Sequence, residues 1–164
     1  MQYLPQRSIW QIYFQATRPA FLSITALACI LGVTTGAWQT INWPISLVGL
    51  LLALIAHGAA NVINDYHDSK NGSDWNNTNR IYPFTGGSRF IQEKILSEQQ
   101  IKIFAIILFL IVIIAGLILV ALSSPHLIWI GFLGIAIGWF YSAKPVELMS
   151  RGIWGEISLS IAWA

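Results

Sequence analysis

The chain has 164 residues, of which 55% are apolar and only 10% are charged. Ordinary soluble domains contain about 25% charged residues, so this composition predicts a protein whose main solvent is lipid. The net charge of +2 is small, and the nine Lys and Arg residues form no basic stripe with interleaved aromatic residues, so nothing supports binding to nucleic acid.

Five apolar stretches predict an all-α, multi-spanning transmembrane helix bundle. Before them, residues 1–18 form an amphipathic segment expected to lie at the membrane surface. The first four stretches are expected to cross the membrane, because about 20 residues at ~1.5 Å each cover a hydrocarbon core of ~30 Å. The expected spans, all within one domain over residues 1–164, are about 20–41, 44–64, 103–122, 126–143 and an incomplete 157–164.

The charged residues lie at one end of this predicted bundle. All nine basic and seven acidic residues fall in the N-terminal segment, in 64–102 or in 144–156, and the links 39–43 and 123–125 contain none. By the positive-inside rule the charged side is cytoplasmic. We expect an integral protein of a bacterial inner (plasma) membrane, with the N-terminus and the acidic loop in the cytoplasm.

A polar cluster follows the second predicted span. If the helix continues there, Asn61, Asn64, Asp65 and Asp68 share one face with His57. Polar groups at the edge of an apolar span are costly and tend to mark function, which favours a site over solvated loop residues. Carboxylate and amide oxygens suit Mg²⁺, which proteins usually share with a substrate phosphate, whereas no Cys or His set suits zinc or copper.

The hydrophilic segment 66–100 is predicted to be a long loop with a short helix from about Ser88 to Leu96. Loops of this length are usually functional or disordered. Three of its basic residues could bind phosphate oxygens that a metal leaves free; these are Arg80, Arg89 and Lys94. The acidic cluster and this loop together predict a metal–diphosphate site at the membrane surface.

The run Asn61-Val-Ile-Asn-Asp-Tyr-His-Asp68, followed by Asp74 and Thr85-Gly-Gly-Ser-Arg89, resembles a known motif. It is similar to the first aspartate-rich motif and following loop of the UbiA superfamily of intramembrane prenyltransferases. The spacing between the motif and Asp74 is most similar to that in the branch of the family that prenylates 1,4-dihydroxy-2-naphthoate on the way to menaquinone. Further pieces resemble the family pattern in the same order: Arg18-Pro19, Tyr141-Ser-Ala-Lys-Pro145, Arg151-Gly152 and Glu156.

The resemblance implies Mg²⁺-dependent transfer of a polyprenyl group from a polyprenyl diphosphate to an aromatic acceptor of the quinone-precursor type. It implies that Asp65 and Asp68 are catalytic. The implied metal ligands are Asn64, Asp65, Asp68 and Asp74, and the implied diphosphate contacts are Asn61, Arg80, Arg89 and Lys94.

The family has further spans and a second aspartate-rich motif on a later loop. We therefore expect this chain to be the N-terminal half of a UbiA-like domain, whose activity needs the C-terminal half or a second copy. One alternative is a non-catalytic membrane protein that keeps the half-fold for lipid or partner binding. A second is a small carrier or channel lined by His57 and Asn61.

Overall fold

The computed structural model describes residues 7–36, 41–76, 79, 81 and 86–163. Within these residues the regular structure is entirely helical, which confirms the predicted all-α class. The elements are α1 (Ile9–Ala16), α2 (Pro19–Thr35), α3 (Trp43–Asn71), α4 (Ser73–Asn76), α5 (Glu98–Leu122), α6 (Leu127–Phe140), the 3-10 helix η2 (Leu148–Ser150) and α7 (Ile153–Trp163).

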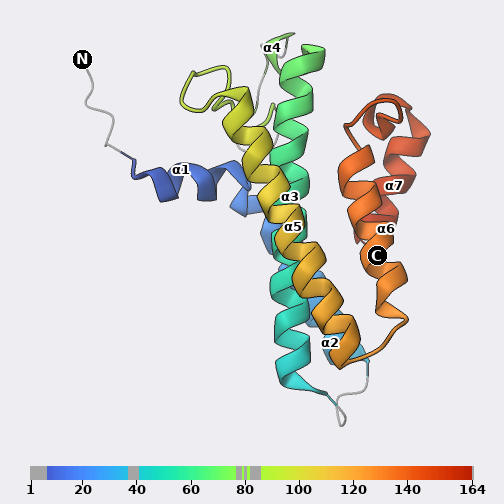
Figure 1. Cartoon of the computed structure of the whole chain (residues 1–164). Coiled ribbons are helices and arrows are strands. Elements are labelled where there is room, and N and C mark those ends of the chain that lie inside the picture. The colour runs from blue at the N-terminus through green and yellow to red at the C-terminus, as the bar shows by residue number, and fades with distance from the viewer. Residues whose placement is uncertain (1–6, 37–40, 77–78, 80, 82–85, 164) are drawn as a thin grey trace.

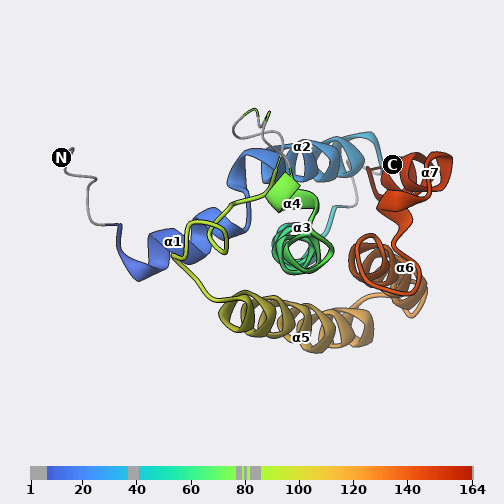
Figure 2. The ribbon, with the colours of Figure 1, turned by 90° about the horizontal axis from the view of Figure 1, so that it is seen from above.

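Helix α3 forms the centre of the bundle. Figure 2 shows it end-on, with α2, α5 and α6 arranged around it. Its most extensive contact is with α5, where Ala59 and Ile63 of α3 belong to the same buried cluster as Ile101 and Ala105 of α5. Burying these side chains against each other fixes the two helices side by side. Most other apolar side chains of the bundle face outward, as expected for helices in contact with lipid.

Among the described residues, two helices are long and apolar enough to cross a membrane, α3 with 29 residues and α5 with 25. Helices α1 and α2 pass the same test only as a pair, which is bent by 58° at their junction. Figure 1 shows α1 extending sideways from the bundle, in keeping with a segment at the membrane surface. Helix α6 has 14 residues, so at ~1.5 Å per residue it is shorter than a ~30 Å hydrocarbon core. The expected span 126–143 therefore contains a helix too short to cross by itself.

Helix α3 continues without a break through the polar cluster, which meets the condition for the shared face, and it takes in residues 66–71, which were expected to belong to the loop. It begins at Trp43, where the Asn42 side chain accepts a hydrogen bond from the Ile45 backbone N–H, and it ends at Asn71. Gly72 stops it in the left-handed conformation, with φ of 85°. The carboxylates are thus attached to the same rigid helix that forms the centre of the bundle.

The loop before α5 differs from the predicted short helix at 88–96. Arg89 and Lys94 adopt left-handed backbone conformations, with φ of 62° and 57°, which interrupt a regular helix. The segment instead forms hydrogen-bonded turns in which the Ile95 and Leu96 N–H groups donate to the Phe90 carbonyl at 2.8 and 3.0 Å. The buried side chains of Phe90 and Leu96 attach these turns to the core beside the acidic cluster.

Candidate functional site

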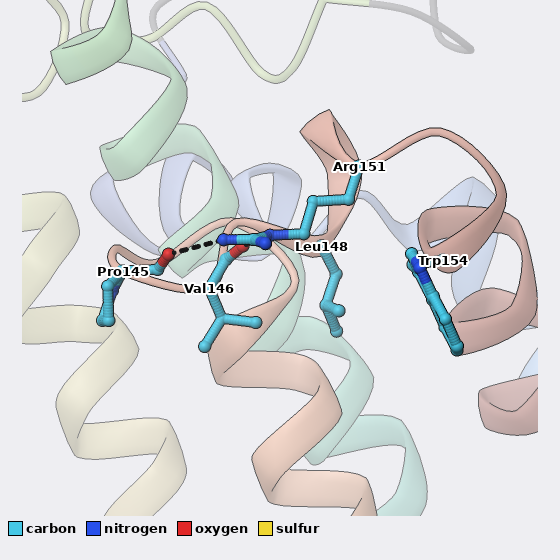
Figure 3. Close-up of a pocket in the computed structure, with 5 residues that line it drawn as sticks. All are labelled: Pro145, Val146, Leu148, Arg151 and Trp154. Atoms are coloured by element: carbon cyan, nitrogen blue, oxygen red, sulfur yellow. Dashed lines mark hydrogen bonds between the residues drawn. The ribbon is translucent and has the colours of Figure 1, made fainter.

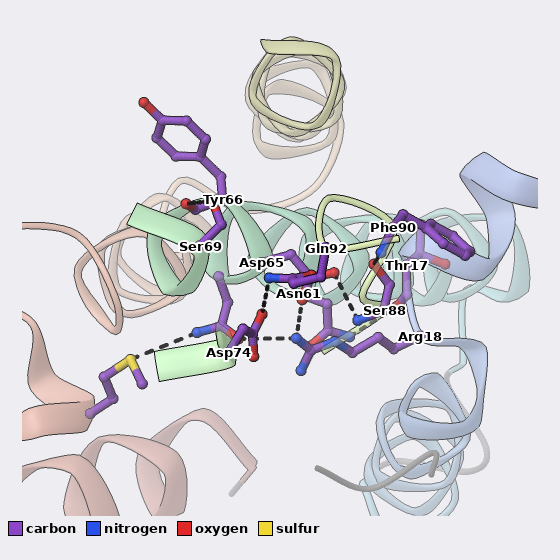
Figure 4. Close-up of polar contacts among 12 residues, drawn as sticks. Thr17, Arg18, Asn61, Asp65, Tyr66, Ser69, Asp74, Ser88, Phe90 and Gln92 are labelled. Atoms are coloured by element: carbon purple, nitrogen blue, oxygen red, sulfur yellow. Dashed lines mark hydrogen bonds and ion pairs between the residues drawn. The ribbon is translucent and has the colours of Figure 1, made fainter. Parts of the chain in front are cut away.

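Three carboxylates are buried at the charged end of α3, where the α1–α2 junction, α4 and the loop from Gly86 onward meet. Asp65, Asp68 and Asp74 are 2%, 7% and 3% exposed. Burying a charged group is expensive unless it is paired or coordinated. These acids are therefore not solvated loop residues, and Figure 4 shows polar side chains from several segments directed at Asp65 and Asp74.

Arg18 provides the main compensating charge. It lies at the junction between α1 and α2 with φ of 55°, immediately before Pro19 begins α2. Its Nη2 donates to Asn64 Oδ1 at 3.2 Å and forms an ion pair with Asp65 Oδ1. Sequence reasoning missed Arg18 as a site residue. The available signal was an arginine held at the start of an apolar span, at the end of the bundle that contains the acids.

The loop backbone lies directly against this Arg18–Asp65 pair. Gly87 has φ of +65°, and a Cβ placed there would lie 2.6 Å from Asp65 Oδ1, 3.0 Å from Asp74 Oδ2 and 3.0 Å from Arg18 Nη2. The Ser88 backbone N–H donates to Asp65 Oδ2 at 3.0 Å. Both oxygens of Asp65 are therefore engaged, and only a glycine at 87 allows the loop to approach this closely.

Asp74, on α4, is held from the same loop. Gln92 Nε2 donates to Asp74 Oδ2 at 3.3 Å, and Arg89 Nη1 donates to the Asp74 backbone carbonyl at 3.3 Å. Burial raises the pKa of Asp74, and the nearby charge of Asp65 raises it further, while Arg18 and Arg89 oppose the shift. The raised pKa shows that burial and the charge of Asp65 together outweigh the attraction of the two arginines.

The two asparagines of the cluster connect α3 to other segments. Asn61 Nδ2 donates to the Thr17 carbonyl at 2.9 Å, which attaches the α1–α2 junction to α3. Asn64 Nδ2 contacts Met149 Sδ of η2 at 3.8 Å. The amide group of Asn61, expected to contact diphosphate, thus already has a structural role, and Asn64 retains its carbonyl oxygen as a polar group directed at the Arg18–Asp65 pair.

In the described part of the chain, the predicted metal ligands do not form a complete metal site. Among them there is no group of three or more His, Cys, Asp or Glu side chains that could hold an ion as they stand. One feature nevertheless fits a cation: Asp68 Oδ1 is buried and has no hydrogen-bond partner within the described part of the chain. Carboxylate and amide oxygens are also the donors that Mg²⁺ prefers, so the residues fit this ion in chemistry.

Of the basic residues predicted to bind diphosphate, only some lie near the buried acids. Arg89 reaches Asp74, whereas Lys94 is exposed on the turn after Phe90. No described hydrogen bond or ion pair joins Lys94 to the carboxylates. Arg80 lies outside the described residues.

The second charged link is stabilised by Arg151. Its Nη2 donates to the Pro145 carbonyl at 3.0 Å and its Nε to the Val146 carbonyl, as Figure 3 shows. These residues line a largely apolar cavity of about 470 Å³ together with Leu148 and Trp154. Because Arg151 is engaged by backbone carbonyls of its own link, its role here is structural.

Comparisons with known proteins agree with the resemblance. The model of the UbiA prenyltransferase family matches residues 21–164. Among curated proteins, the 1,4-dihydroxy-2-naphthoate octaprenyltransferase of Escherichia coli (strain K12) is 32% identical over 130 residues, which cover 78% of this chain and 40% of that protein. The protein of the same name from Bacillus subtilis (strain 168) is 30% identical over 149 residues, covering 90% of this chain and 46% of its own length.

A third relative has a different name. The UbiA prenyltransferase domain-containing protein 1 of Ailuropoda melanoleuca is 30% identical over 147 residues, covering 85% of this chain and 41% of that protein. The chain thus spans less than half the length of these relatives. No solved structure matches it significantly.

Proposed function

The chain belongs to the UbiA prenyltransferase family, and from that membership we propose that it serves in the transfer of a polyprenyl group from a polyprenyl diphosphate to an aromatic acceptor. The acceptor we propose is 1,4-dihydroxy-2-naphthoate, because the Escherichia coli and Bacillus subtilis relatives are named for it. The observation that carries the proposal is the set of buried carboxylates at the end of α3. We place this end on the cytoplasmic side, from the distribution of charge.

In this proposal Asn64, Asp65, Asp68 and Asp74 hold Mg²⁺. When bound, the ion supplies positive charge that stabilises the leaving diphosphate. The orphaned Oδ1 of Asp68 is the donor already free for it, while Asp65 becomes a ligand only when its Oδ1 is released by Arg18.

The other residues of the site orient these groups. The Ser88 N–H fixes the carboxylate of Asp65, and Gln92 fixes that of Asp74. Arg18 and Arg89 provide the positive charge closest to the acids and are the described side chains best placed to bind phosphate oxygens. Such fixed donors and acceptors lower the reorganisation that the reaction requires.

The test is Mg²⁺-dependent binding of a radiolabelled polyprenyl diphosphate to the chain in phosphatidylcholine vesicles. We expect binding that chelation of Mg²⁺ abolishes and that Asp68→Asn weakens. Glu93→Gln is the matched control, because this acid is exposed on the loop outside the cluster. Binding that is indifferent to chelation and to Asp68→Asn would contradict the proposal. Adding the aromatic acceptor then tests transfer itself.

A second candidate is a non-catalytic membrane protein that keeps this part of the fold to bind lipid or a partner. The ion pair between Arg18 and Asp65 favours it, since Arg18 neutralises the charge of a predicted metal ligand. This candidate predicts no transfer and no dependence on Mg²⁺. Detectable transfer by the 164-residue chain, lost on Asp65→Ala and Asp68→Ala, would exclude it.

A further inference from the structure

A second cavity of about 470 Å³ lies on the other side of α3, between α3 and α5 at their charged ends. Its polar part is formed by Tyr66, Lys70, Glu98 and Lys102, and its apolar wall includes Ile103 and Ile106. Figure 4 shows Tyr66 directed away from Asp65 and Arg18. The cavity is therefore separate from the acidic cluster.

Two ammonium groups from different helices meet at one aromatic ring in this cavity. Lys70 Nζ lies 5.9 Å from the Tyr66 ring centroid, and Lys102 Nζ lies 5.6 Å from the same centroid. The ring face attracts both cations, but they also repel each other. Glu98 forms an ion pair with Lys70, whereas no described ion pair joins Lys102 to a carboxylate. The mouth of the cavity thus has an excess of one positive charge.

An apolar strip continues from this charged mouth along α5. Ile103 is followed at helical spacing by Ile107, Leu110 and Ile114, which are 48%, 50% and 59% exposed. Because α5 is one of the two helices able to cross the membrane, this strip leads from the charged end toward the hydrocarbon core. A ligand that fits both parts has an anionic head and an apolar chain.

We propose that this cavity binds an anionic phospholipid. Its phosphate lies between Lys70 and Lys102, and an acyl chain lies along the strip that begins at Ile103. Both lysines lie at the charged end of a helix able to cross the membrane, where a basic side chain can extend toward head groups while its alkyl stem stays in apolar surroundings. The shared chemistry, a phosphate on an apolar chain, also occurs in a polyprenyl diphosphate. We favour the phospholipid because Asp65, Asp68 and Asp74 do not line the cavity and Tyr66, which does, points away from Asp65.

Native mass spectrometry of the 164-residue chain tests this, with protein released from vesicles of equal parts phosphatidylglycerol and phosphatidylcholine. We expect preferential retention of phosphatidylglycerol, and loss of that preference in Lys70→Gln/Lys102→Gln. Arg7→Gln/Lys144→Gln is the matched control, because it removes the same charge from exposed residues outside the cavity. The control should keep the preference, and equal helical circular dichroism checks that each variant is folded.

A variant that is expected to bind more lipid distinguishes a specific effect on the cavity from a general loss of binding in a damaged protein. Glu98→Gln removes the carboxylate that competes for Lys70, so we expect more phosphatidylglycerol to be retained. The proposal is overturned if Lys70→Gln/Lys102→Gln keeps the preference or if the control pair loses it equally. It is also overturned if a water-soluble glycerophosphate without acyl chains competes as strongly as phosphatidylglycerol at equal concentration, since the acyl chain would then contribute nothing. Retention of added polyprenyl diphosphate over phosphatidylglycerol, through the same lysines, would likewise overturn it.

Discussion

Replacing Arg18 by Gln tests the central electrostatic contact of the acidic cluster. The change removes the guanidinium from Asp65 and Asn64 but leaves Asp65 buried, with the Ser88 N–H as its remaining described partner. Removing one partner of a buried ion pair costs about 3–5 kcal/mol. The Arg18 side chain is 18% exposed, so water relieves part of this penalty. We therefore expect a loss of about 2–3 kcal/mol in the free energy of unfolding.

The assay is a double-mutant cycle measured by denaturation in detergent micelles. Arg18→Gln and Asp65→Asn are made singly and together, and the double variant should recover most of the loss because it no longer buries an uncompensated charge. Adding Mg²⁺ should stabilise Arg18→Gln more than the unmodified chain, since Asp65 is then free to bind the ion. Arg7→Gln, an exposed arginine outside the cluster, is the control.

Two results would refute this reasoning. If Arg18→Gln leaves stability unchanged, the ion pair contributes no net stability. If the effects of the two single substitutions simply add in the double variant, Arg18 and Asp65 do not interact energetically, and the proposed exchange between arginine and metal at Asp65 has no basis.

Three further predictions concern the loop, the start of α5 and the acid on α4. Gly87→Ala should cost about 1–2 kcal/mol, because alanine is strained at φ of +65° and its Cβ would lie 2.6 Å from Asp65 Oδ1; an unchanged melting temperature would contradict this. Ser97→Ala should cost about 1 kcal/mol through loss of the α5 capping box, seen as a lower melting temperature, whereas Ser97→Asp, which can still cap, should retain most of the stability. The raised pKa of Asp74 means that the folded state loses stability as pH rises from the ordinary aspartate pKa through the raised value. The Asp74→Asn variant should therefore be more stable than the unmodified chain above that pH range but not below it. A difference in melting temperature between the two proteins that is the same at every pH would contradict this.

The elements that the sequence predicted correctly depend on local signals. The apolar run from Pro44 predicts a helix that carries the polar cluster on one face, and α3 extends this helix beyond the expected end at 64, to Asn71, where Gly72 stops it in the left-handed conformation. Ser97 and Gln100 form a capping box that places the start of α5 five residues before the predicted 103. Because charged side chains occur only in three segments, the distribution of charge along the sequence also located the end of the bundle that contains the acids.

The partners of the acids were not predictable in the same way, because they come from distant parts of the chain. Arg18 is 47 positions from Asp65, and Ser88 is 23 positions from it. Arg18 reaches Asp65 because of the bend between α1 and α2. Ser88 reaches it because the loop turns there, with Arg89 in a left-handed conformation that a glycine would have signalled more clearly in the sequence. The sequence motif identifies the carboxylates but not the cation that neutralises them.

That cation is the main physical question about the site. Three buried acids, Asp65, Asp68 and Asp74, lie near two arginines, so the cluster has an excess of one negative charge if all are ionised. Arg18 reduces the repulsion by pairing with Asp65, yet Asp68 Oδ1 stays buried without a described partner. A divalent cation would satisfy Asp68 and oppose the repulsion at Asp74, and in the proposed exchange it replaces Arg18 at Asp65. Released arginine would then be available to phosphate oxygens, which couples metal binding to diphosphate binding through one side chain. The expected consequence is that diphosphate strengthens Mg²⁺ binding in the unmodified chain more than in Arg18→Gln.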